Sequence, residues 1–382
     1  MSKRRICVWS GKRGGFGALA PTMDAISAHP DLELLLVVTD QHLYDHFGKT
    51  VDEVEGRFRI AAQIDMAQAG DSNADRARAV GRCVEKSVDV IQDLAPEILL
   101  VIGDRGEVLA ASIVAHNMRI AIAHIQGGDV SGSLDEPVRH AVTKLAHIHF
   151  AATKASAERI ISMGEEPWRV HVVGDPHLDP ILLGNMTSET ELRTRYNLPV
   201  DEPFLLVLQH SDSTVPENSS VQMMETIAAV TPFNLRTLFI YPCSDQGYEG
   251  IISQIEAAAL PPLVTVHKNI PAQDFSGLER LAACIIGNSS AGLIEAPYFG
   301  LPAVNVGLRQ IGREYCKNVI HVPYDRNAIS AAINRALNDI EFRHSLKKLE
   351  PPFGDGYAFD RMTKIMASTA LDDALLNKRM TY

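Results

Sequence analysis

Short, largely apolar runs alternate with longer stretches of helical periodicity along most of this chain. In the first half the apolar runs are Ile6–Trp9, Leu34–Thr39, Ile98–Ile102, Ile120–Ile125 and Ile148–Ala151. The helical stretches between and after them are Gly17–Ala28, Arg76–Leu94, Glu107–His116, Glu136–Leu145 and Ala155–Met163. A strand that is apolar on both faces must be covered on both faces. The alternation therefore predicts a parallel sheet with helices on either side.

The same pattern returns in the second half, after a polar, Pro-containing region at 174–190. Its apolar runs are Phe204–Leu208, Thr237–Tyr241, Leu263–Val266, Cys284–Ile286 and Ala303–Val306. We therefore predict an α/β fold of two Rossmann-like domains, 1–180 and 181–359, followed by a periodic tail at 360–382. Two such domains in sequence predict a cleft between them, with ligands bound just after the carboxyl ends of the strands.

Composition limits the classes of partner. The 382 residues have a formal net charge of −11, which argues against a nucleic-acid or anionic-membrane surface as the main partner. The apolar runs are far shorter than the roughly 18 residues of a membrane span. The basic N-terminus precedes only four apolar residues, so we interpret it as a first strand and not as a signal peptide. Five scattered cysteines without CxxC spacing indicate reduced thiols and a cytoplasmic protein.

Polar and glycine residues follow the first-half strands. Lys12 and Arg13 lie in a glycine-rich loop that is either a phosphate-binding loop or a flexible turn. Asp104 and Arg105 follow the run Ile98–Ile102, where Asp104 is either a catalytic carboxylate or a helix N-cap.

A second polar segment follows the run Ile120–Ile125. It contains Gln126, a Gly-Gly pair that permits close approach of a ligand, and Asp129. Asp135 and Glu136 come next, just before a helix with Pro137 in its first turn. We expect one of these two carboxylates to cap the helix and the other to face the cleft.

In the second half, His210 follows the run Phe204–Leu208 and is either structural or part of the site. Ser289 and Ser290 open a helix whose N–H groups suit an anion. Glu295 is either a partner for a ribose diol or a solvated side chain. A later loop adds two guanidinium groups, those of Arg309 and Arg313. Together with the basic first loop, these residues predict a diphosphate and ribose site between the two domains.

At these residues the chain resembles a known family, the UDP-N-acetylglucosamine 2-epimerases. Within it, the sequence is similar to the hydrolysing branch used in sialic-acid-type sugar biosynthesis. The motifs that match this branch in type and order are NSSAG at 288–292, LRQIGRE at 308–314, VSGSLD at 130–135 and RHAVTKLAH at 139–147. The resemblance extends from the first strand to about Phe359.

The resemblance implies a glycosyltransferase-B-like fold in which a C-terminal helix, within 360–382, returns to the first domain. It implies anti elimination of UDP to give a 2-acetamidoglycal, then hydration with inversion at C2 to release a free N-acetylmannosamine-type sugar. The substrate would be UDP-N-acetylglucosamine or a modified relative, such as a 2,4-diacetamido-trideoxy sugar nucleotide. It implies no metal and no other cofactor, and a homodimer or higher homo-oligomer.

The resemblance also implies residue roles. Asp104 and Asp135 match catalytic carboxylates, while Arg105 and His210 match contacts to the nucleotide sugar. The positions that match the nucleotide and phosphate site are Arg13, Ser289, Ser290, Glu295 and Arg309, and those that match a loop against the uracil are Lys268, Asn269 and Ile270.

Three departures from the family concern this site. Gln126 replaces a glutamate implicated in proton transfer, and an amide cannot act as a base. The first loop reads Arg13-Gly14-Gly15-Phe16 where Arg-Ala-Asp-Tyr is usual, and Ser211-Asp212 stands where Pro-Val is usual. Either Asp129 or Glu136 takes over the proton transfer, or the substrate and reaction differ, or activity is low. The alternatives are a hydrolase or eliminase without C2 inversion, a non-catalytic nucleotide-sugar binding protein and a glycosyltransferase.

Overall fold

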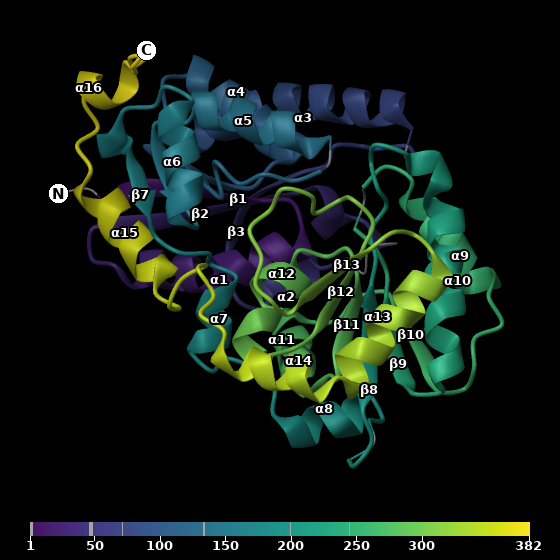
Figure 1. The fold of residues 1–382 in the computed structure, drawn as a ribbon. Helices are drawn as coiled ribbons and strands as arrows, with labels where there is room; N and C mark the ends of the chain where they lie inside the picture. Colours follow the sequence, from purple (N-terminus) through teal and green to yellow (C-terminus); the bar gives the residue numbers. More distant parts are fainter. Residues whose placement is uncertain (1–2, 46–48, 71, 133, 199, 244) are drawn as a thin grey trace. The chain divides into compact units, whose positions relative to one another are not determined.

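The computed structural model describes residues 3–45, 49–70, 72–132, 134–198, 200–243 and 245–382 (Figure 1). The chain divides into two compact units. The first contains Met1–Asp129, Asp135–Gly184 and Pro352–Tyr382. The second contains Val130–Leu134 and Asn185–Pro351. The chain thus passes into the second unit for five residues before it returns to the first, and its C-terminal segment belongs to the first unit.

The first unit is built on a parallel sheet of seven strands in the order β3-β2-β1-β4-β5-β6-β7. The strands are β1 (Arg4–Ser10), β2 (Leu32–Thr39), β3 (Ile60–Ile64), β4 (Ile98–Ile102), β5 (Ala121–Ile125), β6 (Ile148–Ala151) and β7 (Val170–Val172). The helices are α1 (Arg13–Ala28), α2 (Val51–Glu55), α3 (Asn73–Leu94), α4 (Gly106–Asn117), α5 (Asp135–Leu145), α6 (Lys154–Ser162), α7 (Leu178–Leu182), α15 (Ala358–Ser368) and α16 (Asp373–Leu376).

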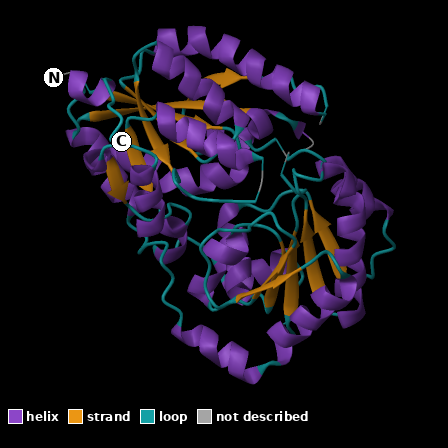
Figure 2. Cartoon of the chain, turned by 45° about the horizontal axis from the view of Figure 1, so that its top comes forward, coloured by secondary structure: helices purple, strands orange, loops and turns teal. Residues whose placement is uncertain are grey.

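Alternate residues of the central strand β1 enter two separate cores. Ile6 and Val8 pack with residues of α1 and α15, whereas Cys7 and Trp9 pack with residues of α3 and α4. Because successive strand residues point to opposite faces, a strand that is apolar throughout places both faces in a core. The continuous apolar sequence of β1 is therefore the reason that helices cover both faces of the sheet (Figure 2).

The second unit repeats the design with a parallel sheet of six strands in the order β10-β9-β8-β11-β12-β13. The strands are β8 (Phe204–Leu208), β9 (Arg236–Ile240), β10 (Val264–His267), β11 (Cys284–Gly287), β12 (Ala303–Val306) and β13 (Val319–Val322). The helices are α8 (Glu189–Arg195), α9 (Ser219–Val230), α10 (Tyr248–Ala257), α11 (Ala272–Leu281), α12 (Ala291–Ile294), α13 (Arg326–Asn338) and α14 (Ile340–Ser345). Here Leu205 and Val207 of β8 enter one core, and Leu206 and Leu208 the other.

The fold class predicted from the sequence is confirmed: the chain has two α/β units with parallel sheets. The ten predicted strands are present, and three further strands complete the sheets: β3, β7 and β13. All three lie at sheet edges, where part of each strand is exposed and the sequence is not continuously apolar. The predicted tail helix is two helices, α15 and α16.

Both sheets reverse their direction of strand addition beside the first strand of the unit. In the first unit this happens between β1 and β4, and in the second between β8 and β11. In doubly wound sheets, ligands bind beyond the carboxyl ends of the strands at this point. The loops that begin after Ser10, Ile102, Leu208 and Gly287 are therefore the places to look for a site.

The C-terminal segment is fixed to the first unit by buried charges. Arg169 donates hydrogen bonds to the main-chain oxygens of Ala374 and Leu375, at 2.6 and 2.7 Å. Lys378 donates to the main-chain oxygens of Lys144 and Ala146, both at 2.7 Å, and pairs with Glu165.

All five cysteines are free thiols. Among the described residues, no helix is both long enough and apolar enough to cross a membrane.

Candidate active site

Asp104 lies two residues after the end of β4 and pairs with Arg139 of α5. Arg139 is 2% exposed, and its second amino group donates to the main-chain oxygen of Gln126 at 3.0 Å. Helix α4 is capped by Arg105, so Asp104 is not the N-cap that was one of its two interpretations. The buried guanidinium fixes the Asp104 carboxylate at the end of the strand, next to the loop that follows β5.

Gln126 has a left-handed backbone, with a φ of +64°, and its side chain turns toward two residues beyond β7. Its amide donates to Oδ2 of Asp175 at 2.8 Å. Oδ1 of the same carboxylate accepts from Nδ1 of His177 at 2.7 Å. Gln126 therefore forms a network with a buried carboxylate and a histidine, and neither of these was predicted as a site residue.

Arg105 is buried among acidic side chains. Its guanidinium lies 3.5 Å from Asp40 and 3.3 Å from Glu107. Burial raises the pKa of Glu107, and the charge of Arg105 opposes that shift. An added Cβ on Gly11 would clash with the Glu107 carboxyl group, so the first loop lies directly against this cluster.

Of the other predicted acidic residues, one contacts α6 and two lie in α5. An oxygen of Asp129 accepts from the hydroxyl of Ser156 at 2.7 Å. Asp135 and Glu136 both lie in the first turn of α5, and Glu136 is 3.7 Å from His140 one turn later. Within the part of the chain that the structure describes, no group of three histidine, cysteine or acidic residues is arranged to hold a metal ion.

Helix α1 begins at Arg13, whose side chain lies outside the description, as does Ser133 of the VSGSLD motif. Phe16, at the position where the family has tyrosine, is buried and packs edge-on against the rings of His42 and Phe58. This departure from the family therefore contributes to the core of the first unit.

In the second unit, His210 follows β8 and is 6% exposed. Its Nδ1 accepts a hydrogen bond from the main-chain N–H of Cys243 at 3.0 Å. A neutral histidine that accepts at Nδ1 has its hydrogen on Nε2. The contact therefore assigns to His210 a tautomer whose Nε2 is a hydrogen-bond donor, which suits an anionic ligand.

Asn288, fully buried after β11, holds three strand-end loops together. Its side chain accepts from the N–H of His210 at 2.7 Å and donates to the oxygen of the same residue at 2.9 Å. Its main-chain oxygen accepts from Arg309 at 3.2 Å and from Gln310 at 2.8 Å. The loops after β8, β11 and β12 therefore meet beside Ser289, which follows Asn288.

The predicted anion-binding residues lie around this centre. Ser290 stands at the N-cap position of the single-turn helix α12 without a side-chain capping hydrogen bond, and the hydroxyl of Ser289 accepts from the N–H of Ala291 at 3.4 Å. Arg309 pairs with Asp245 at 2.9 Å, and Arg313 donates to the main-chain oxygen of Val130 at 3.3 Å.

Lys268, Asn269 and Ile270 follow β10. Ile270 is buried in a core cluster of the second unit, so its side chain serves packing. Lys268 is exposed and Asn269 is partly buried.

Glu295 follows α12 and interacts with Glu279 of α11, whose side chain is fully buried. Burial, together with the neighbouring carboxyl group of Glu295, raises the pKa of Glu279 well above its ordinary value. Because the folded chain holds this proton where the unfolded chain does not, the associated stability is present at acidic pH and is lost as the pH rises through the folded pKa.

We therefore expect Glu279→Gln to unfold at the same temperature as the wild type near pH 4.5 and a few degrees higher at pH 8. The amide of the variant stays neutral at both pH values. At pH 8, by contrast, ionisation of the carboxyl group in the unfolded chain favours unfolding of the wild type. Thermal unfolding followed by circular dichroism across this range would test the prediction. A difference in unfolding temperature between the two proteins that does not change with pH would contradict the prediction.

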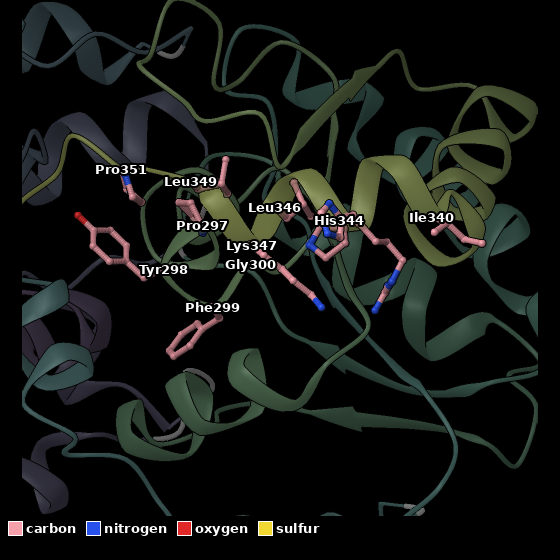
Figure 3. Close-up of a pocket in the computed structure, with 12 residues that line it drawn as sticks. Pro297, Tyr298, Phe299, Gly300, Ile340, His344, Leu346, Lys347, Leu349 and Pro351 are labelled. Carbon is pink, nitrogen blue, oxygen red and sulfur yellow. The ribbon is translucent and has the colours of Figure 1, made fainter.

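A cavity of 810 Å³ lies in the second unit, away from the strand-end loops (Figure 3). Gly300 and Pro302 line it and precede β12, so they lie at the opposite end of that strand from the loop with Arg309. Its other lining residues include the basic side chains Arg343, His344 and Lys347. No described residue of the predicted site lines this cavity.

Three residues of the strand-end network were not predicted from the sequence: Arg139, Asp175 and His177. Arg139 belongs to the RHAVTKLAH motif, but the motif by itself does not indicate its contact with Asp104. Asp175 and His177 lie in the region that the sequence indicates as the boundary between domains, because it contains Gly174, Pro176 and Pro180. Recognition of Val170–Val172 as a strand would have identified both, since they follow its carboxyl end.

Comparisons with known proteins agree with this architecture. Residues 24–367 match the family model for UDP-N-acetylglucosamine 2-epimerase. A UDP-N,N'-diacetylbacillosamine 2-epimerase (hydrolyzing) of Legionella pneumophila is 33% identical over 380 residues, which cover 99% of this chain and 100% of the relative. A UDP-N-acetylglucosamine 2-epimerase of Neisseria meningitidis serogroup B is 31% identical over 87% of each chain.

Solved structures confirm the fold. The crystal structure of UDP-GlcNAc 2-epimerase from Neisseria meningitidis bound to UDP-GlcNAc superimposes with a TM-score of 0.80 at 17% identity, over 96% of this chain and 100% of that one. The fold is therefore glycosyltransferase-B-like. From the family model and the full-length similarity, the chain belongs to the UDP-N-acetylglucosamine 2-epimerase family.

Proposed function

We propose that this protein is a hydrolysing 2-epimerase of UDP-linked 2-acetamido sugars, with UDP-N,N'-diacetylbacillosamine as the leading substrate. The observation that carries the proposal is the full-length, 33% identity to a hydrolysing 2-epimerase of that nucleotide sugar. The first loop supports a modified sugar, because Gly15 stands where the family has an aspartate and so removes one polar side chain. UDP-N-acetylglucosamine is the second substrate to test.

The reaction we propose needs one proton transfer in each of two stages. In the first, a base removes the proton at C2, the C1–O bond breaks, and UDP leaves with the bonding electrons. In the second, water adds across the resulting double bond and places hydroxyl at C1 and a proton on the other face of C2. Asp104, held by Arg139, is the proposed acid or base at this centre, and Asp135 is the second proposed carboxylate.

For the nucleotide, we propose residues of the second unit. The Nε2–H of His210 would donate to the leaving diphosphate, and Arg309 with the N–H groups after Ser289 would bind its charge. Glu295 would accept from the ribose hydroxyls. Further proposed contacts are Arg13, Arg105, Asp129, Ser290, Arg313 and the 268–270 loop.

The protein should release UDP from UDP-N,N'-diacetylbacillosamine faster than from UDP-N-acetylglucosamine. In deuterated water, proton NMR should show a free sugar with inverted configuration and deuterium at C2, because the C2 proton exchanges through the glycal. Failure to release UDP from either nucleotide sugar would refute the proposal.

A second candidate, elimination or hydrolysis without inversion, is favoured by Gln126 alone, since an amide stands where the family has a base. The same NMR experiment separates the two reactions, because the second gives a glycal or a sugar that keeps its configuration. UDP binding without turnover would instead indicate a nucleotide-sugar binding protein.

We further propose a cytoplasmic homodimer. Free thiols are typical of proteins in reducing compartments. Light scattering after size exclusion would test the dimer.

A further inference from the structure

Position 126 holds a glutamine where the family has a glutamate. Gln126 lies after β5, and its amide donates to Asp175, so this side chain acts as a hydrogen-bond donor to a carboxylate. An amide does not accept a proton at neutral pH. If the proton transfer is kept, another side chain at this edge of the sheet must perform it.

Asp175 is 1% exposed, and its two oxygens accept from different partners. Oδ2 accepts from Gln126, and Oδ1 accepts from the main-chain N–H and the Nδ1 of His177, at 3.0 and 2.7 Å. Burial by itself would raise the pKa of Asp175, but the interactions with His177 and the hydrogen bonds outweigh burial and lower it. Asp175 is therefore ionised, and a glutamate at 126 would bring a second negative charge against it.

These contacts fix the tautomer of His177. A carboxylate only accepts hydrogen bonds, so Nδ1 of His177 donates to Asp175. Nδ1 therefore has no lone pair for Gln126, whose amide nitrogen is 3.3 Å away. In the neutral ring the lone pair is then on Nε2, as in other aspartate-oriented histidine bases.

His177 belongs to the same strand-end network as Asp104. Arg139 pairs with Asp104 and donates to the main chain of Gln126, whose side chain meets Asp175. An added Cβ on Gly103 would lie 3.9 Å from Oε1 of Gln126, so the loops after β4 and β5 are adjacent. The side chain of His177 keeps 23% of its surface exposed, whereas that of Asp175 is buried.

We propose that His177 is the base that takes the C2 proton, with Asp175 as the residue that positions it and Gln126 as the neutral partner that leaves Asp175 ionised. The C2 proton moves to Nε2, the C–H electron pair forms the C1–C2 double bond, and UDP leaves with the electrons of the C1–O bond. The imidazolium, stabilised by Asp175, then returns its proton to solvent. This inference rests on the proposed function and assigns one of its steps.

The test compares His177→Ala with the control His171→Gln, a partly buried histidine of β7 that lies outside the network. We expect His177→Ala to lower kcat by roughly 10²–10⁴-fold, with UDP affinity by calorimetry within threefold of the wild type. Imidazole added to the variant should restore part of the rate, which a purely structural defect would not allow. Replacement of C2 hydrogen by deuterium in the substrate should slow the variant further.

A second variant, Gln126→Glu, tests whether the neutral amide at position 126 is needed for His177 to act as the base. We expect it to lower kcat, because the new carboxylate competes with Asp175 for His177. A tenfold rise would mean that a glutamate restores the base, and it would overturn the inference. A His177→Ala protein with kcat within threefold of the wild type would also overturn the inference. The proposed function would be unaffected by that result. A wild-type protein that releases no UDP would overturn both.

Discussion

Asp104→Asn should lower kcat for UDP release by roughly 10²–10⁴-fold, the usual cost of losing a general acid or base. The change keeps the shape of the side chain but removes its charge and its ability to exchange a proton. Arg139, which is buried, would then face an amide in place of a carboxylate. Because the nucleotide is proposed to bind to residues of the second unit, KM and UDP affinity should change by no more than a few-fold.

Steady-state UDP release would measure the change in kcat and KM, and calorimetric titration of the same preparations with UDP would measure the change in UDP affinity. Asp93→Asn is a matched control, since Asp93 is an exposed carboxylate on α3 outside the network. Turnover within threefold of the wild type would remove Asp104 from the proposed mechanism. A loss of UDP affinity with kcat unchanged would mean that the residue binds substrate and takes no part in the chemistry.

The central strands were predictable because burial on both faces leaves a clear signal in the sequence. The five residues of β8 are all apolar, and they alternate between two cores. The edge strand β7 has no such signal, because its three residues are only partly covered and include a histidine. For β8 and β7, the difference in burial therefore explains why the sequence predicts one strand and not the other.

The same reason explains which parts of the candidate site were found. Asp104 and His210 follow strands that the sequence identifies, so their positions at a strand end could be inferred. Asp175 and His177 follow a strand that it does not identify, and the glycine and prolines around them indicated a linker. Pairings such as Asp104 with Arg139 join residues 35 positions apart, and only the packing of α5 against the sheet brings them together.

A second large effect is expected far from the chemistry, at the buried charge cluster that holds the C-terminal segment. Glu165 is 1% exposed and pairs with Lys144 and Lys378, both at 2.6 Å, and with His149 at 3.2 Å. Burial by itself would raise the pKa of Glu165, but the hydrogen bonds from these three partners lower it to about 2. Burial also lowers the pKa of Lys378 to about 8, so this lysine depends on Glu165 to remain charged.

Glu165→Gln should destabilise the first unit by about 3 kcal/mol at pH 7, because removal of the carboxylate leaves the largely buried Lys378 without its counter-charge. For a unit of this size, that corresponds to a fall of roughly 10 °C in unfolding temperature. The depressed pKa means that the stabilisation is complete above pH 4.5, where glutamate ionises in the unfolded chain, and is lost as the pH falls toward 2. The difference in unfolding temperature between the variant and the wild type should therefore become smaller as the pH falls from 4.5 toward 2.

Calorimetry from pH 7 to 3 would measure this difference, and limited proteolysis would show whether the segment after α15 is released first. Glu158→Gln, an exposed glutamate on α6, is the control and should leave the unfolding temperature unchanged. Because Lys378 binds main-chain oxygens as well as Glu165, Lys378→Met should release the same segment. A Glu165→Gln protein that unfolds within 2 °C of the wild type at pH 7 would mean that packing of α15 against α1, and not the charge cluster, holds the C-terminal segment in place.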